Sequence, residues 1–112
     1  MKIEVRHREG VTIIAPKGKI TIGVGDIALR EAVTEALEAG AGSILIDLEA
    51  VSTIDSSGIG ELVSAYTTVT NRGKKLALMH LPKKVADLLQ ITQLIAVFDI
   101  YESEDEAIEN LA

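Results

Sequence analysis

The sequence contains no cysteine, and aromatic residues make up only 3% of its 112 residues. Without cysteine, the chain can have no disulfide framework, no thiolate nucleophile and no cysteine-ligated zinc site. Its two histidines, His7 and His80, have no other histidine or carboxylate at ligand spacing, so we expect structural or surface residues and no metal site. With so few aromatic residues, Ile, Leu, Val and Ala must fill the core, which suits parallel strands covered by helices.

Basic residues are absent from the last quarter of the chain. No lysine or arginine follows Lys84, whereas six acidic residues lie from residue 99 onward, and the formal net charge is −6. Binding to nucleic acid requires basic residues that contact phosphates, so this function is disfavoured. The acidic end favours solubility or, as an alternative, a basic protein partner.

The chain also lacks a long apolar run. No stretch approaches the roughly 18 apolar residues needed to span a bilayer, and the first residues have no apolar signal core. We therefore expect a cytoplasmic protein without membrane insertion. The length predicts one domain over residues 1–112, too small for separate catalytic and substrate domains.

Strand and helix patterns alternate along the chain after an N-terminal hairpin. The predicted strands are Ile3–Arg8, Val11–Ala15, Ser43–Leu48, Lys75–His80 and Ala96–Ile100. The predicted helices run from a cap at Asp26 to Gly40, from Ser57 to Arg72, from Pro82 onward, and from the capping box that Ser103 begins. This order predicts an α/β fold, with the hairpin leading into a mixed, mostly parallel sheet of about five strands and about four helices packed on it.

The most informative segment is Asp55-Ser56-Ser57-Gly58, which follows a buried strand and precedes an amphipathic helix. Asp and Ser are common helix N-caps, so these residues can simply cap the helix. The same position favours a phosphate, because backbone N–H groups and the helix dipole stabilise negative charge there. We therefore regard the two serines as candidate acceptors of a phosphoryl group.

Three other chemistries fit the sequence less well. Gly23-Val24-Gly25 begins a match to a dinucleotide-binding fingerprint, but Lys19–Ile22 is a poor strand to precede it. Asp47 ends a strand, as in phospho-accepting receiver domains, but the acidic pair and the late lysine of that chemistry are missing, so Asp47 is expected to satisfy backbone groups. No hydrolytic triad is evident around the serines.

At this motif the sequence resembles the STAS domain, and specifically the bacterial anti-sigma factor antagonists. The resemblance centres on Leu45–Leu48, Val51 and Ile54–Gly60, and it continues through residues 72–78, 82–89 and 91–101. It therefore covers nearly the whole chain and is most specific around the serine pair.

The resemblance implies a regulatory protein that is not an enzyme and holds no cofactor. It implies that the unphosphorylated chain binds an anti-sigma factor, a serine kinase of the histidine-kinase-like ATPase fold, and so releases the sigma factor. Ser56 would be the phosphorylated residue, with Ser57 as the fallback, and a PP2C-type serine phosphatase would reverse the modification. Asp55 would orient the loop.

The resemblance also implies contacts with the partner around the start of the helix. Gly58 and Gly60 would let the kinase approach the backbone, and Ile59 and Val63 are candidate interface residues, although Val63 shares the expected buried stripe. The loop Gly18–Asp26 departs from the family pattern, because its acidic residue is displaced or replaced. This departure points to a specialised partner or another ligand. The alternative functions are a STAS scaffold or transporter subunit and, third, a small-ligand or nucleotide-binding domain.

Overall fold

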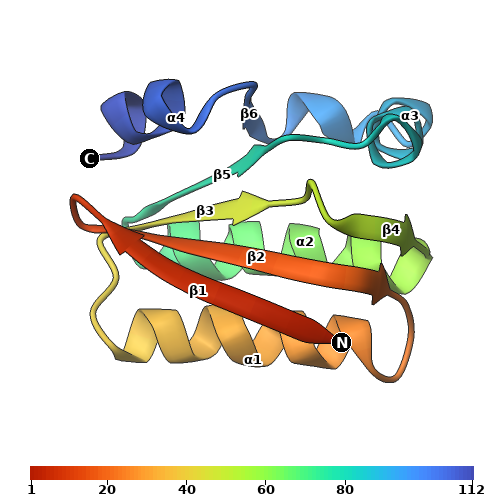
Figure 1. The fold of residues 1–112 in the computed structure, drawn as a ribbon, viewed down its shortest axis with the longest axis horizontal. Helices are drawn as coiled ribbons and strands as arrows, with labels where there is room; N and C mark the ends of the chain where they lie inside the picture. The colour runs from red at the N-terminus through yellow and green to blue at the C-terminus, as the bar shows by residue number, and fades with distance from the viewer.

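A computed structural model describes all residues, from Met1 to Ala112. The chain alternates six strands with four α-helices and one short 3₁₀ helix (Figure 1). The elements are β1 (Lys2–Arg8), β2 (Val11–Ile20), α1 (Gly25–Glu38), β3 (Ser43–Asp47), β4 (Val51–Ile54), α2 (Ser56–Asn71), β5 (Lys75–Met79), α3 (Lys83–Ile91), η1 (Leu94–Ala96), β6 (Asp99–Tyr101) and α4 (Glu104–Leu111). None of the helices has both the length and the apolar character that crossing a membrane requires.

The sheet has the strand order β1-β2-β3-β5-β6, and all of its pairings except the β1–β2 hairpin are parallel. The long strand β2 has two parallel partners in succession. Its first part, Val11–Ile14, pairs with β3, and its last part, Gly18–Ile20, pairs with β4. The predicted fold class, with its hairpin, mostly parallel sheet and four helices, is confirmed.

Two apolar clusters lie on opposite faces of the sheet, because side chains alternate along each strand. On one face, Ile44 and Ile46 of β3 belong to the larger cluster, which α1, α2 and α3 cover. On the other face, Leu45 of β3 belongs to a smaller cluster that α4 covers. The four helices are therefore divided unequally, three on one face of the sheet and one on the other.

The predicted strand pattern needs three corrections. The strand β4 was not anticipated, and β2 continues past Ala15 to Ile20. Pro16 is tolerated within β2 because it lies between the segments that pair with β3 and β4, so its missing N–H removes no bond to either strand. The predicted strand Ala96–Ile100 is instead the end of a 3₁₀ turn followed by β6, which begins at Asp99.

Candidate functional site

The serine pair lies where β4 ends and α2 begins. Asp55 has an extended backbone and is the N-cap of α2, and its carboxylate Oδ1 accepts a hydrogen bond of 2.9 Å from the Gly58 N–H. This bond satisfies one of the backbone donors that a helix start leaves without a partner. The predicted capping motif is therefore present, and it fixes the first turn that carries Ser56.

The same carboxylate also ties the site to the loop between β2 and α1. Asp55 Oδ2 accepts a hydrogen bond of 3.1 Å from the Ile22 N–H, and the Asp55 N–H donates to the Ile20 carbonyl. The bond from Gly58, followed by that from Ile22, lowers the pKa of Asp55, because both stabilise the charged carboxylate. Asp55 is thus an ionised anchor that joins two loops.

The two serines differ in exposure. Ser56 is exposed as the first residue of α2, whereas Ser57 is partly buried. Neither hydroxyl makes a hydrogen bond within the protein, and the first turn of α2 contains no acidic residue. A phosphate on Ser56 would therefore lie at the positive end of the helix dipole, next to the ionised N-cap carboxylate of Asp55. Ser56 has the better access of the two.

The glycines and the isoleucine that follow have unequal roles. A Cβ on Gly58 would lie 2.6 Å from Ile54 Cγ1 and still closer to the Ile20 carbonyl oxygen, so the missing side chain lets α2 pack on β2 and β4. Gly58 thus has a packing role that was not anticipated, and its role toward a partner stays a prediction. Gly60 is exposed and has open space at its Cβ position, so that role remains a prediction there.

Ile59 also has a different environment from the one expected. It is only 5% exposed and belongs to the large core cluster, and Val63 is partly buried against the same cluster. Little of its surface is open to a partner in this conformation, so its place among the interface residues stays a prediction. Its packing instead holds the start of α2 against the sheet.

An exposed apolar patch adjoins the site and was not identified from the sequence. Ile22, Val24 and Ile27 expose 73%, 64% and 41% of their surface, and Ile22 is the residue that donates to Asp55. The loop and the start of α2 lie at the same end of the molecule (Figure 1). The sequence signal that could have predicted this patch is the presence of apolar residues in a glycine-rich loop. We call these three residues the 22–27 patch.

The glycine-rich match to the dinucleotide fingerprint has a structural explanation. The β2 strand does include Lys19 and Ile20, contrary to the expectation of a poor strand, and α1 begins at Gly25. Gly25 packs against that strand, because a Cβ there would lie 2.7 Å from Ile20 Cα. The glycine is therefore required by the packing of α1 on β2.

Asp26 occupies the backbone donors that a phosphate would need at this loop. It is buried in the first turn of α1, and its Oδ1 accepts from the N–H groups of Gly23 and Ile27 at 2.9 and 2.8 Å. The prediction that Asp26 is the N-cap of α1 is wrong. The residue at the N-cap position is Val24, which makes no side-chain cap bond. The Asp26 carboxylate therefore occupies the position that the phosphate of a bound nucleotide would need.

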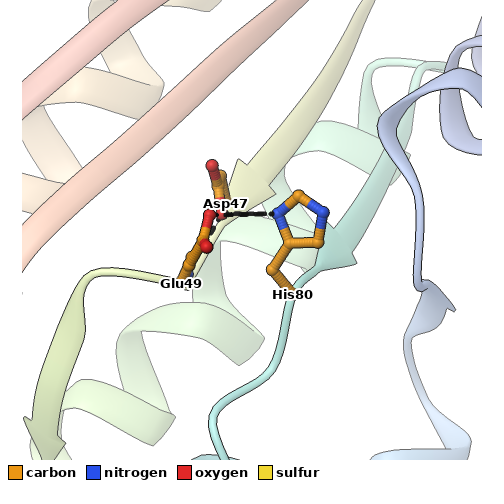
Figure 2. A group of neighbouring side chains, drawn as sticks. All are labelled: Asp47, Glu49 and His80. Atoms are coloured by element: carbon orange, nitrogen blue, oxygen red, sulfur yellow. Dashed lines mark hydrogen bonds and ion pairs between the residues drawn. The ribbon is translucent and has the colours of Figure 1, made fainter.

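A second group of polar side chains gathers at the ends of β3 and β5 (Figure 2). His80 Nδ1 lies 3.2 Å from Asp47 Oδ1 and 3.7 Å from Glu49 Oε2. Asp47 Oδ1 also accepts from the Glu49 N–H at 3.0 Å, which confirms its predicted role toward backbone groups. The expectation that His80 has no carboxylate neighbour is wrong, because the parallel pairing of β3 with β5 brings distant residues together.

The sequence is similar to known proteins over almost its whole length. The family model of the STAS domain matches residues 2–107. An anti-sigma-B factor antagonist of Listeria monocytogenes is 37% identical, covering 95% of this chain and 93% of that protein. An anti-sigma F factor antagonist of Paenibacillus polymyxa is 27% identical, covering 99% and 95%.

A solved structure agrees with these sequence matches. The crystal structure of a Thermotoga maritima protein assigned as an anti-sigma factor antagonist superposes with a TM-score of 0.89 at 25% identity, over 97% of this chain and 93% of that one. Because the family model covers residues 2–107 of the 112, the chain belongs to the STAS domain family.

Proposed function

We propose that this chain is an anti-sigma factor antagonist that phosphorylation of Ser56 switches off. The observation that carries the proposal is the exposed Ser56 hydroxyl at the capped start of α2, free of hydrogen bonds within the protein. The relatives named as anti-sigma factor antagonists, which the chain matches over almost its whole length, support the choice of function.

The unphosphorylated chain binds an anti-sigma factor that is also a serine kinase of the histidine-kinase-like ATPase fold. Binding uses the surface around Ser56, the open backbone at Gly60 and the neighbouring 22–27 patch. Exposed apolar side chains next to polar backbone groups are typical of protein interfaces, which combine an apolar centre with a polar rim. The sigma factor is released as a consequence.

The kinase then transfers a phosphoryl group from ATP to the chain. A bond forms between Ser56 Oγ and the γ-phosphorus, the bond from that phosphorus to ADP breaks, and the hydroxyl proton goes to a base. Asp55 is a poor base, because its two oxygens accept backbone hydrogen bonds and its pKa is lowered. The base therefore comes from the kinase, and Asp55 positions the first turn.

The added charge ends the complex. A phosphate brings about −1.5 to −2 charges into an interface that was built around a neutral hydroxyl, so it is desolvated and meets the acidic groups of the kinase. A loss of about 3 kcal/mol would weaken binding more than a hundredfold. A PP2C-type serine phosphatase restores the hydroxyl and returns the chain to its binding state.

The test compares Ser56→Ala and Ser56→Asp for binding to the kinase from the same genome. We expect Ser56→Ala to bind as the wild type does and Ser56→Asp to bind at least about a hundredfold more weakly. Ser57→Asp is the matched control and is expected to have a smaller effect, since Ser57 is partly buried. Equal binding by Ser56→Ala and Ser56→Asp would overturn the switch.

Intact mass after incubation with ATP and the kinase tests the acceptor directly. One added phosphate is expected on the wild type and on Ser57→Ala, and none on Ser56→Ala. Modification of Ser56→Ala would instead assign Ser57. No modification with any candidate kinase would favour a constitutive STAS scaffold, which light scattering would reveal as a stable assembly.

A further inference from the structure

We propose that Asp47, Glu49 and His80 form a binding site for a divalent transition-metal cation, and we call them the β3–β5 cluster. One ligand atom from each residue lies within 4.8 Å of the other two. Figure 2 shows both carboxylates and the imidazole converging on one point between the ends of the two strands. This site is separate from the serine pair and from the function proposed for it.

The distances suit a metal. Zinc binds imidazole nitrogen and carboxylate oxygen at about 2.0–2.2 Å, so neighbouring ligand atoms in a tetrahedral site are about 3.4 Å apart. His80 Nδ1 and Asp47 Oδ1 are 3.2 Å apart, close to this separation. Glu49 Oε2 is 3.7 Å from His80 Nδ1 and belongs to a side chain that is 76% exposed, which leaves it free to move inward.

The cluster has more carboxylates than nearby basic partners. A neutral imidazole can donate only one hydrogen bond through Nδ1, yet two carboxylates lie close to that atom. No lysine or arginine is within salt-bridge distance of Asp47 or Glu49. A divalent cation would neutralise both carboxylates and accept the imidazole lone pair, which no single proton can do.

The nearby basic residues are already engaged. Arg6 and Lys17 line the cavity of about 300 Å³ beside Asp47 and Glu49. Arg6 hydrogen-bonds Glu104 of α4, however, and Lys17 hydrogen-bonds Glu4 at 2.8 Å. The cavity therefore gives solvent and a cation access to the carboxylates while its own positive charges are held by other partners.

The backbone places one of the three ligands at the end of a strand and the other two in the turns that follow the strands. Asp47 is the last residue of β3 and pairs with Met79, the last residue of β5, so the residues that follow these strands meet at one edge. His80 then adopts a left-handed conformation, with φ of 56°. Ligand sites in parallel sheets commonly lie beyond the carboxyl ends of the strands, as this one does.

The ligand set selects the class of cation. Imidazole nitrogen with two carboxylates suits zinc, cobalt or nickel, whereas magnesium and calcium prefer oxygen ligands alone. Three protein ligands leave at least one position for water. We therefore expect Zn²⁺ and Co²⁺ to bind and Mg²⁺ not to compete.

The test is calorimetric titration of the full, tag-free chain with ZnCl₂, followed by Co²⁺ absorption spectra. We expect one Zn²⁺ per chain and a weakening of at least about tenfold for His80→Asn, a substitution chosen because Asn tolerates the left-handed conformation. Glu49→Gln changes an exposed residue and is expected to weaken binding without affecting folding. His7→Asn, which changes the other histidine, is the matched control.

Each result decides the proposal. A single site that is lost in His80→Asn and weakened in Glu49→Gln, but kept in His7→Asn, supports it. The absence of Zn²⁺ binding up to about millimolar concentration, or equal isotherms for wild type and His80→Asn, overturns it. If His80→Asn does not fold, the comparison of Glu49→Gln with wild type gives the answer.

Discussion

Helices α1 and α2 both begin against the end of β2, but they begin in different ways. The first turn of each has a glycine, Gly25 or Gly58, packed on the backbone of β2. Only α2 has a side-chain cap at its N-cap position, Asp55. The helices are also joined further along, where Arg30 of α1 makes two hydrogen bonds to the buried carboxylate of Glu61 in α2.

The difference separates two tasks at one end of the molecule. The capped start of α2 holds the exposed Ser56 in a fixed position, which suits a site of modification. The start of α1 uses Asp26 internally and leaves apolar side chains in solvent, which suits contact with a partner. Both helices pack closely on β2 through a glycine. Substitutions can therefore disrupt this shared packing, the Asp55 cap of α2 or the exposed patch before α1.

The largest effect is expected from breaking the shared packing with Gly58→Ala. The added methyl group would meet the Ile20 backbone and Ile54, which cannot move away without shifting a strand. We expect the free energy of unfolding to fall by about 3 kcal/mol, as for severe overpacking. Gly25→Ala should lower it by a similar amount, since its Cβ would also meet the β2 backbone. Urea denaturation measures it, and an unchanged midpoint for Gly58→Ala would contradict the close approach.

Gly60→Ala in the same helix is the matched comparison and should act in the opposite direction. Its Cβ position is open and its residue lies inside α2, so alanine gains helix propensity without a clash. We expect the free energy of unfolding to rise by up to about 1 kcal/mol. Destabilisation by Gly60→Ala would show that this face of α2 is more crowded than the structure indicates.

The cap that distinguishes α2 should be visible in the pH dependence of stability. The pKa of Asp55 is lowered in the folded state by hydrogen bonds from Gly58 and Ile22. Its stabilising contribution is therefore present above the unfolded pKa of about 3.9 and is lost as the pH falls through the lower folded pKa. Asp55→Asn keeps a capping side chain but should lose this part of the acid dependence.

Thermal unfolding of wild type and Asp55→Asn between about pH 2 and pH 7 makes the comparison, within the range where Asp titrates. The two curves should converge at the acid end, where Asp55 is protonated. Parallel curves over the whole range would mean that Asp55 does not carry the effect.

The smallest effect on stability is expected where α1 begins with exposed side chains. Ile22→Thr changes a side chain that is 73% exposed and keeps the backbone N–H that donates to Asp55, so the free energy of unfolding should stay within about 0.5 kcal/mol. The same variant should weaken kinase binding, since the 22–27 patch is part of the proposed interface. Val5→Thr, an exposed residue of β1, is the control and should leave binding unchanged.

The capped serine motif could be predicted from the sequence because its parts are contiguous. Asp55 and Gly58 are three residues apart, and local rules of helix capping cover that distance. The bond from Ile22 to Asp55 joins residues 33 positions apart and depends on how β2 pairs with β4. No local pattern contains that information.

The missed features have the same origin. Strand β4 has only four residues, of which two are exposed, so its pattern was too short to identify. The β3–β5 cluster depends on the register that sets Asp47 opposite Met79, and the burial of Ile59 depends on which side of α2 faces the sheet. The fold class was accessible, because the alternation of strands and helices is a property of the whole chain.

Strand β2 pairs with β3 along its first part and with β4 along its last part, so amide hydrogen exchange in the two parts reports on different neighbours. The N–H of Gly18 donates to Ala50 at 3.0 Å, just before β4, whereas residues 11–14 pair with β3. A partner that alters the β4–α2 junction would change exchange at residues 18–20 and leave residues 11–14 unchanged. The strand thereby offers an internal reference, in which one half records events at Ser56 and the other half records the stability of the core.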